Sequence, residues 1–258
     1  MSGQSRKAEQ FAAYHVKGDP IILFNIWDVG SAKAVSQAGA MALATGSAPV
    51  AMANGFADGE HIPFEMALAN ITRIVKATDL PVSMDMEGGY GVDPDTIATN
   101  VTRTLETGVV GFNFEDQIIG GEGLYPVDQQ AHRVGAMRRA CDTAKVPAFI
   151  NARTDIFLKA KPETHSGDML NDAIARAKAF ADAGASGFFA PGLKDEALIG
   201  RLCDAVALPV NIIALPGAPK NARLAELGVA RISYGPVPYK RMVAWLEDAA
   251  REALTSMS

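Results

Sequence analysis

The sequence predicts an α/β protein, a (β/α)8 TIM barrel, in which parallel strands alternate with helices. Two observations predict it: apolar segments rich in β-branched residues recur eight times along the 258 residues, and amphipathic helical segments separate most of them. Strands that are apolar throughout and separated by helices are typical of a parallel sheet buried on both faces. Eight such units in about 250 residues match the usual size of this barrel. An open doubly wound sheet is the alternative.

The predicted elements keep one rhythm along the chain. Between strands, apolar side chains recur on one helical face, as Leu68, Ile71 and Val75 do. Glycine closes the helix ahead of several strands, as at Gly39 and Gly184. Nothing breaks this rhythm, so we expect one barrel domain over residues 1–258. The strands are expected at 21–28, 41–47, 81–87, 109–116, 146–155, 186–191, 209–215 and 230–234.

Composition and charge exclude several classes of partner. The chain is 48% hydrophobic and 21% charged, which is typical of an ordinary globular protein. The net charge is −5, and lysine and arginine form no cluster, so we expect neither nucleic acid nor a membrane surface as a partner. No apolar segment has the length of a signal peptide core or a membrane span, which predicts a cytoplasmic protein.

Polar side chains gather at the carboxyl ends of the predicted strands, where the active sites of such barrels lie. Asp85 and Glu87 are two residues apart on one strand, so their side chains are expected to point to the same side. Hard oxygen ligands at this spacing suit hydrated Mg²⁺ or Mn²⁺, whereas a solvated acidic turn is the alternative. Other polar residues at strand ends include Thr45, Gly46, Ser47, Glu115, Asn151, Arg153, Asp155, Asn211, Ser233 and Tyr234.

This inventory predicts a metal site beside an anion site. Mg²⁺ takes one or two carboxylates directly and keeps several waters, so the remaining acids among Asp85, Glu87 and Glu115 would hold those waters. Arg153 offers a planar guanidinium that binds a substrate carboxylate through two parallel hydrogen bonds; an ion pair with Asp155 is the alternative. The combination implies a small anionic α-keto or α-hydroxy carboxylate as substrate.

The turn at Thr45, Gly46 and Ser47 could offer N–H and hydroxyl donors to the same anion. The alternative is a strand that merely ends in small residues. The enolate formed in such a site needs a proton, for which water, Tyr234 and Tyr90 are candidates. Packing is the alternative role for both tyrosines.

These residues resemble the isocitrate lyase and phosphoenolpyruvate mutase superfamily. The resemblance covers nearly the whole chain and implies a (β/α)8 barrel, commonly a homotetramer, whose last helix is exchanged between neighbouring subunits. The apolar stretch at Met242, Val243, Trp245 and Leu246 suits such a helix, and packing on its own barrel is the alternative. Five segments in the family's order carry the resemblance: 25–28 (NIWD), 55–59 (GFADG), 85–91 (DMEGGYG), 113–117 (NFEDQ) and 150–155 (INARTD).

The resemblance also implies roles for the metal-side residues. Asp85 would bind Mg²⁺ directly, whereas Asp58, Glu87 and Glu115 would hold it through water. Asp58 would also position or deprotonate a reacting group. A simple turn aspartate before Gly59 is the alternative for Asp58.

On the substrate side, the resemblance implies that Arg153 and the turn at Thr45, Gly46 and Ser47 bind the substrate carboxylate. Arg153 is therefore counted with Asp58 as catalytic. Asn211, within Pro209, Val210 and Asn211, is similar to an active-site amide of the family.

The expected active-site lid, at about 116–130, departs from the family pattern. Lyases acting on isocitrate and methylisocitrate carry a Lys-Lys/Arg-Cys-Gly-His sequence there, whose thiol donates a proton. Residues 118–126 instead read IIGGEGLYP, without Cys, His or Lys. Cleavage of isocitrate or methylisocitrate is therefore disfavoured, and the asparagine-bearing lid of phosphonopyruvate mutases is not evident either.

The sequence thus predicts a Mg²⁺-dependent lyase that cleaves a C–C bond of a 2-oxo or 2-hydroxy carboxylic acid through a pyruvate enolate, as in oxaloacetate decarboxylation. The metal would act as a Lewis acid, and Mn²⁺ could replace it. One alternative is a phosphonopyruvate-type mutase or hydrolase that acts on a P–C bond. The other is a non-catalytic carboxylate-binding protein, which is disfavoured because the chain retains all four acids.

Overall fold

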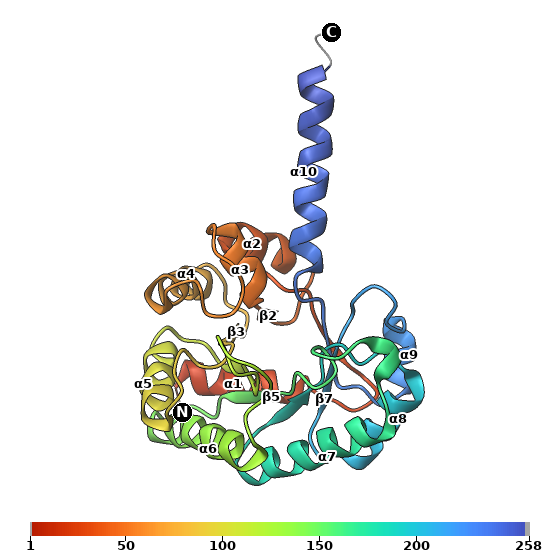
Figure 1. Cartoon of the computed structure of the whole chain (residues 1–258). Helices are drawn as coiled ribbons and strands as arrows, with labels where there is room; N and C mark the ends of the chain where they lie inside the picture. The colour runs from red at the N-terminus through yellow and green to blue at the C-terminus, as the bar shows by residue number, and fades with distance from the viewer. Residues whose placement is uncertain (1, 256–258) are drawn as a thin grey trace.

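Eight parallel strands form one sheet in the computed structural model, which describes residues 2–255. The sheet order is β1-β8-β7-β6-β5-β4-β3-β2, so the first strand pairs with the last. A bridge between Ile26 and Thr45 links the segment after β1 to the end of β2, which nearly closes the sheet (Figure 1). The strands are β1 (Ile21–Leu23), β2 (Leu43–Ala44), β3 (Val82–Asp85), β4 (Gly111–Glu115), β5 (Phe149–Arg153), β6 (Gly187–Phe189), β7 (Val210–Ile213) and β8 (Arg231–Ser233).

Helices surround this sheet, so the predicted (β/α)8 barrel is confirmed and the open sheet is wrong. Aspartate and serine side chains fix several helix starts: Asp28 accepts a hydrogen bond from the Ser31 N–H at 2.7 Å, in a capping box. The helices are α1 (Gly3–Ala13), α2 (Val29–Gln37), α3 (Ser47–Ala53), α4 (Phe64–Lys76), α5 (Pro94–Leu105), α6 (Val127–Thr143), α7 (Gly167–Asp182), α8 (Glu196–Ala205), α9 (Asn221–Glu226) and α10 (Val237–Thr255), with a 3₁₀ turn, η1, at Pro162–Thr164.

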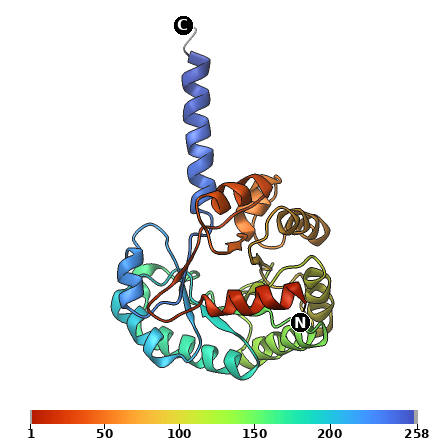
Figure 2. The same cartoon turned by 180° about the vertical axis from the view of Figure 1, so that it is seen from behind.

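The amino-terminal end of the barrel is filled by aromatic side chains from α1 and the segment after it. Figure 2 shows α1 crossing the barrel. Phe11 is fully buried, and the ring of His15 stacks on that of Phe149 with centroids 3.9 Å apart. A Cβ at Gly111 would come within 2.9 Å of the Phe11 ring, so β4 needs glycine there. This end is closed, which leaves the opposite end for a site.

The buried His15 is expected to make stability depend on pH. Burial first, and the positive charge of Arg231 second, lower the pKa of His15 to about 3. Unfolding restores an ordinary pKa near 6.5, so the unfolded chain binds one more proton between these values and the folded state loses stability as pH falls. Urea unfolding at about pH 7.5 and about pH 5 should show this loss, and His15→Leu should reduce it by about 2 kcal/mol. An unchanged difference between the two pH values would contradict the assignment.

The last helix, α10, stands away from the barrel (Figures 1 and 2). Pro238 is its one buried residue within Val237–Thr255, and Trp245 is 67% exposed. Packing of α10 on its own barrel, the alternative considered from the sequence, is therefore wrong for the described chain. Exchange of this helix between subunits of a tetramer stays a prediction. None of the helices described in residues 2–255 combines the length and apolar character needed to cross a membrane.

Candidate active site

A cavity of about 160 Å³ opens at the carboxyl ends of the strands. It has an acidic side, formed by Asp58 and Asp85, and an apolar wall. Of the described residues that line it, Arg153 alone is cationic. The apolar wall comes largely from the last residues of β6 and β7 and from the segments that follow β5 to β8: Leu158, Phe189, Pro191, Ile213, Leu215 and Pro236.

Asp85 ends β3 and is held by the neighbouring strand. Its N–H donates to Thr45 Oγ1 at 3.0 Å, and its Oδ2 accepts from the Ser47 N–H at 3.1 Å. Its Oδ1 is buried and has no hydrogen-bond partner within the described chain. A buried carboxylate oxygen without a partner is costly unless something else binds it. Asp85 Oδ1 is therefore suited to be a direct metal ligand.

The position of Glu87 is set by a turn in the backbone and not by the alternation of side chains along a strand. The strand ends at Asp85, and Glu87 has a left-handed backbone with φ of 52°. Its Oε2 accepts the N–H groups of Gly59 at 2.8 Å and Glu60 at 2.7 Å. The prediction of a strand that continues through Glu87 is thus wrong, because the chain turns at Glu87 to meet the loop after α3, but the two carboxylates still lie close together.

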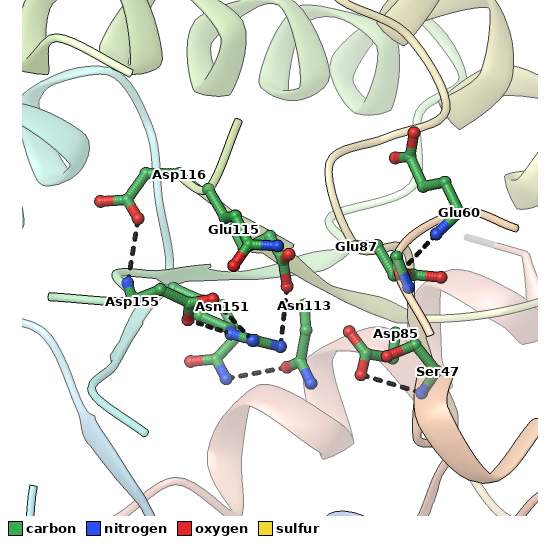
Figure 3. A network of polar contacts seen from close by, with 12 residues as sticks. Ser47, Glu60, Asp85, Glu87, Asn113, Glu115, Asp116, Asn151 and Asp155 are labelled. Atoms are coloured by element: carbon green, nitrogen blue, oxygen red, sulfur yellow. Dashed lines mark hydrogen bonds and ion pairs between the residues drawn. The ribbon is translucent and has the colours of Figure 1, made fainter. Parts of the chain in front are cut away.

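The loop that carries Asp58 is clasped to the turn that carries Glu87 (Figure 3 shows Glu60 and Glu87 joined). While Glu87 accepts the N–H of Glu60, the Glu60 Oε1 accepts the N–H of Tyr90 at 2.7 Å. The Ser47 hydroxyl donates to Asp58, and the Ser47 N–H donates to Asp85. These bonds bring Asp58 and Asp85 to one side of the cavity and hold Glu87 close to both, from segments far apart in sequence.

Glu115 and Arg153 meet in an ion pair. Arg153 Nη1 lies 2.8 Å from Glu115 Oε2, and its Nε and Nη2 donate to the two oxygens of Asp155 at 2.6 and 2.8 Å. The Asp155 pair considered from the sequence is therefore present. A guanidinium has five N–H donors, so two remain beyond these three bonds. Arg153 also lines the cavity, so its guanidinium is placed to contact an anion there.

The acidic side carries more negative charge than the described groups neutralise. Burial, then the charges of Asp58 and Asp85, raise the pKa of Glu87 to about 8. Burial and Asp85 likewise raise the pKa of Asp58. Burial raises the pKa of Glu115 well above its usual range, although Arg153 opposes this. A divalent cation would relieve this repulsion.

The donor set fits a hydrated ion. Among residues 2–255, no three His, Cys, Asp or Glu side chains converge closely enough to coordinate one ion directly. Mg²⁺ does not need this, because it keeps several waters and uses one or two carboxylates. Asp85 Oδ1 as the direct ligand, with Asp58, Glu87 and Glu115 holding waters, therefore suits Mg²⁺ better than a metal that demands a closed set of protein ligands.

The turn expected to bind the substrate anion uses its backbone N–H groups for hydrogen bonds within the protein. The N–H groups of Thr45, Gly46 and Ser47 donate to the oxygens of Ser83, Ile26 and Asp85. Thr45 supports Asp85 and does not line the cavity, whereas Gly46 and Ser47 do. A Cβ at Gly46 would lie 2.9 Å from Pro49 Cγ, so glycine is needed where the chain turns into α3.

Asn211 lies one layer below the cavity rather than on its wall. Its Nδ2 lies 3.1 Å from the Ser233 Oγ, and Ser233 is the member of this pair that lines the cavity.

Neither Tyr90 nor Tyr234 is among the lining residues. Their rings contact Phe64 and Phe24, so packing is what the structure shows for both.

The segment expected as a lid is a loop only as far as residue 126, because α6 begins at Val127. The loop is closed at its base, where the Tyr125 N–H donates to the Asp116 oxygen at 2.8 Å. Arg176 Nη1 donates to Asp116 Oδ2 at 3.1 Å and to the Tyr125 oxygen at 2.9 Å, so it holds the two ends of the loop together. Residues 120–123 are exposed above it.

Three residues of the site were given no role from the sequence: Glu60, Asn113, which lies in the 113–117 segment, and Arg231. Asn113 lines the cavity, and Arg231 is fully buried beneath it. The arginine left a signal, because it is a charged residue inside the apolar run at 230–234. Glu60 gave none, since its partners Glu87 and Tyr90 are 27 and 30 residues away on another loop.

A (β/α)8 barrel with an acidic cluster and an arginine at the carboxyl ends of its strands defines an enzyme of the isocitrate lyase and phosphoenolpyruvate mutase superfamily. The chain belongs to the phosphoenolpyruvate phosphomutase family, whose model matches residues 11–254. Enzymes of this superfamily include carbon–carbon lyases and mutases, and they depend on Mg²⁺.

Similar proteins include ones with and without an assigned reaction. A crystal structure of a candidate phosphonomutase from Burkholderia cenocepacia is 46% identical, with a TM-score of 0.95 over 97% of this chain and 99% of that one. The uncharacterized protein Rv1998c of Mycobacterium tuberculosis is 34% identical over 93% of this chain and 87% of its own length. Oxaloacetate decarboxylase of Pseudomonas savastanoi pv. phaseolicola is 27% identical over 70% of this chain and 61% of its own.

Proposed function

We propose that this enzyme is a Mg²⁺-dependent carbon–carbon lyase that acts on a 2-oxo or 2-hydroxy carboxylic acid through a pyruvate enolate. Decarboxylation of oxaloacetate is the reaction that the cavity fits best. The observation that carries the proposal is the combination of one cation, Arg153, with an acidic side and an apolar wall in one cavity.

The acidic side and Arg153 would hold the 2-oxo acid end of the substrate. The two remaining N–H donors of Arg153 bind the C1 carboxylate, while Asp85 Oδ1 and the waters held by Asp58, Glu87 and Glu115 accommodate the metal. When bound, Mg²⁺ would supply the positive charge that favours an enolate. Ser47 keeps Asp58 and Asp85 in place through its hydroxyl and N–H.

The apolar wall would favour the loss of the second carboxylate. With C1 held at Arg153, the far carboxylate would face the apolar wall, which includes Ile213 and Leu215. The C3–C4 bond breaks, its electron pair forms the C2–C3 double bond, and the C2 oxygen becomes negative while neutral CO₂ leaves. Water then protonates C3. Apolar surroundings disfavour the charged carboxylate and tolerate neutral CO₂.

Action on a P–C bond is the second candidate, and the 46% identity to a candidate phosphonomutase favours it. A phosphonate group stays anionic through transfer, so it needs cations or several donors around it. Among the described lining residues, Arg153 is the one cation, and it would have to serve both ends of such a substrate. This charge balance favours the lyase.

A substrate panel separates the two candidates. The enzyme is incubated with Mg²⁺ and either oxaloacetate or phosphonopyruvate, and products are followed by carbon and phosphorus NMR. We expect pyruvate and bicarbonate from oxaloacetate, and no phosphate or phosphoenolpyruvate from phosphonopyruvate. Mn²⁺ should restore turnover after chelation. Turnover of phosphonopyruvate without turnover of oxaloacetate would replace the lyase by the second candidate.

A further inference from the structure

The interior of the barrel beneath the cavity is polar, and Asn113 on β4 is at its centre. Asn113 Oδ1 accepts two hydrogen bonds, from Asn151 Nδ2 at 2.9 Å and from Arg231 Nη2 at 3.0 Å. An amide oxygen has two lone pairs, and a guanidinium can only donate. Arg231 therefore fixes which way the Asn113 amide faces, with its oxygen turned into the barrel.

The nitrogen of Asn113 is thereby turned toward the cavity. Asn113 and Asp85 are neighbours in register on β4 and β3, and both line the cavity. Figure 3 shows the Asn113 nitrogen on the side toward Asp85. Within residues 2–255 this nitrogen donates to no acceptor, and it is not among the buried atoms left without a partner. It is a free donor at the edge of the site.

Arg231 is a fully buried cation that forms no ion pair within residues 2–255. Its hydrogen bonds go to Asn113 Oδ1 and to Ser233 Oγ at 3.3 Å, and its Nη1 has no partner. Burial lowers the pKa of Arg231 to about 9, and the charge of Asp85 opposes this. Burying an unpaired charge is costly, which calls for a role beyond packing.

We propose that Asn113 donates a hydrogen bond from Nδ2 to the substrate oxygen that becomes negative as the enolate forms, and that Arg231 orients and polarises this donor from inside the barrel. The proposal rests on the lyase function proposed above and adds the protein group that stabilises its charge. Donors fixed before the reaction stabilise a developing oxyanion because they need no reorganisation. A charged donor behind an amide strengthens the next hydrogen bond in the chain. Asn113 is then a catalytic residue and Arg231 a positioning residue.

Two small ligands test the donor without turnover. Oxalate carries a negative oxygen where the enolate would carry one, whereas pyruvate carries a neutral carbonyl. In calorimetric titrations at saturating Mg²⁺, Asn113→Ala should weaken oxalate binding roughly 10- to 100-fold and pyruvate binding only about threefold. An unchanged ratio of the two affinities, or failure of the wild-type protein to bind oxalate, overturns the proposal.

A second substitution guards against a folding defect. Asn113→Asp keeps an oxygen for Arg231 and Asn151 but replaces the donor with a negative oxygen, so it should remain folded and lose oxalate binding almost completely. His15→Leu perturbs the closed end of the same barrel and should leave the ratio of oxalate to pyruvate affinity unchanged. Retained oxalate binding in a folded Asn113→Asp protein would contradict the donor.

Arg231 is tested through its coupling to Asn113. Arg231→Met should lower kcat roughly 10- to 100-fold with KM within about threefold, because the interaction is strongest in the transition state. If Arg231 acts through Asn113, the double variant should lose no more oxalate affinity than Asn113→Ala alone. If the losses of oxalate affinity in the two single variants add in the double variant, Arg231 acts independently of Asn113, and its positioning role is overturned.

The donor and the lyase function fail in different ways. Asn113-dependent oxalate binding in an enzyme that leaves oxaloacetate unchanged would overturn decarboxylation and keep the donor. Decarboxylation of oxaloacetate that survives Asn113→Ala at the wild-type rate, with the same preference for oxalate, would overturn the donor and keep the lyase.

Discussion

Replacing Asp85 with asparagine is expected to lower turnover by ~10³-fold or more and, at the same time, to raise the melting temperature of the metal-free protein. The first effect follows because Asp85 Oδ1 is the unpartnered carboxylate oxygen of the acidic side. The second follows because Asp85 raises the pKa of Asp58 and Glu87 by repulsion, and asparagine removes that charge while keeping an acceptor for the Ser47 N–H.

Calorimetry with and without Mg²⁺ measures both effects. Relief of about 1–2 kcal/mol of repulsion should raise the metal-free melting temperature by roughly 3–6 °C. Mg²⁺ should raise the melting temperature of the wild-type protein and leave that of Asp85→Asn unchanged, since only a ligand bound by the folded state stabilises it. Glu9→Gln, which removes a charge at an exposed position of α1, is the matched control and should behave as wild type. An Asp85→Asn protein that keeps its turnover and its response to Mg²⁺ would contradict the metal site.

Replacing Arg153 is expected to separate its structural and substrate-binding roles. Arg153→Met leaves the buried Glu115 and Asp155 without their partner, so the free energy of unfolding should fall by about 3–5 kcal/mol. Arg153→Lys keeps a positive charge between these acids and should retain much of that stability. It lacks the planar fork, however, and cannot serve both acids and a substrate carboxylate together.

Urea unfolding and steady-state kinetics should therefore rank Arg153→Lys and Arg153→Met differently, the first by stability and the second by kcat/KM. In stability, Arg153→Lys should lie between wild type and Arg153→Met, whereas in kcat/KM both variants should fall by roughly 10²-fold or more. Wild-type kcat/KM in a folded Arg153→Lys protein would show that the guanidinium does not bind the substrate.

The barrel was readable from the sequence because its signals are local. The β-branched runs each indicate a strand, and glycines such as Gly184 each indicate the end of a helix. Their number and order along the chain predict the fold class. The acids at the strand ends followed, since the topology of a barrel brings the ends of its strands together. Asp85, Glu115 and Arg153 were placed near one another on that basis and Asp58 through the family resemblance, and the structure brings all four to the same end of the barrel.

The remaining features depend on contacts between distant segments. Glu87 lies beside Asp58 and Asp85 because its backbone turns left-handed and its carboxylate accepts N–H groups from the loop at residues 59–60, contacts that no alternation pattern predicts. The N–H groups of the turn after β2 donate to Ser83, Ile26 and Asp85 within the barrel, and binding of the substrate carboxylate by this turn stays a prediction. Asn211 lies below the cavity and does not line it, because β7 continues past it to Ile213, which does.

The central claim is tested most directly by following oxaloacetate labelled with ¹³C at C4, using enzyme freed of metal by chelation. With added Mg²⁺, the label should appear as CO₂ and bicarbonate far faster than with Mg²⁺ alone, and Asp85→Asn should return the rate to that of Mg²⁺ alone. Label release that is equally fast after chelation, or no faster than with Mg²⁺ alone, would contradict a Mg²⁺-dependent carbon–carbon lyase.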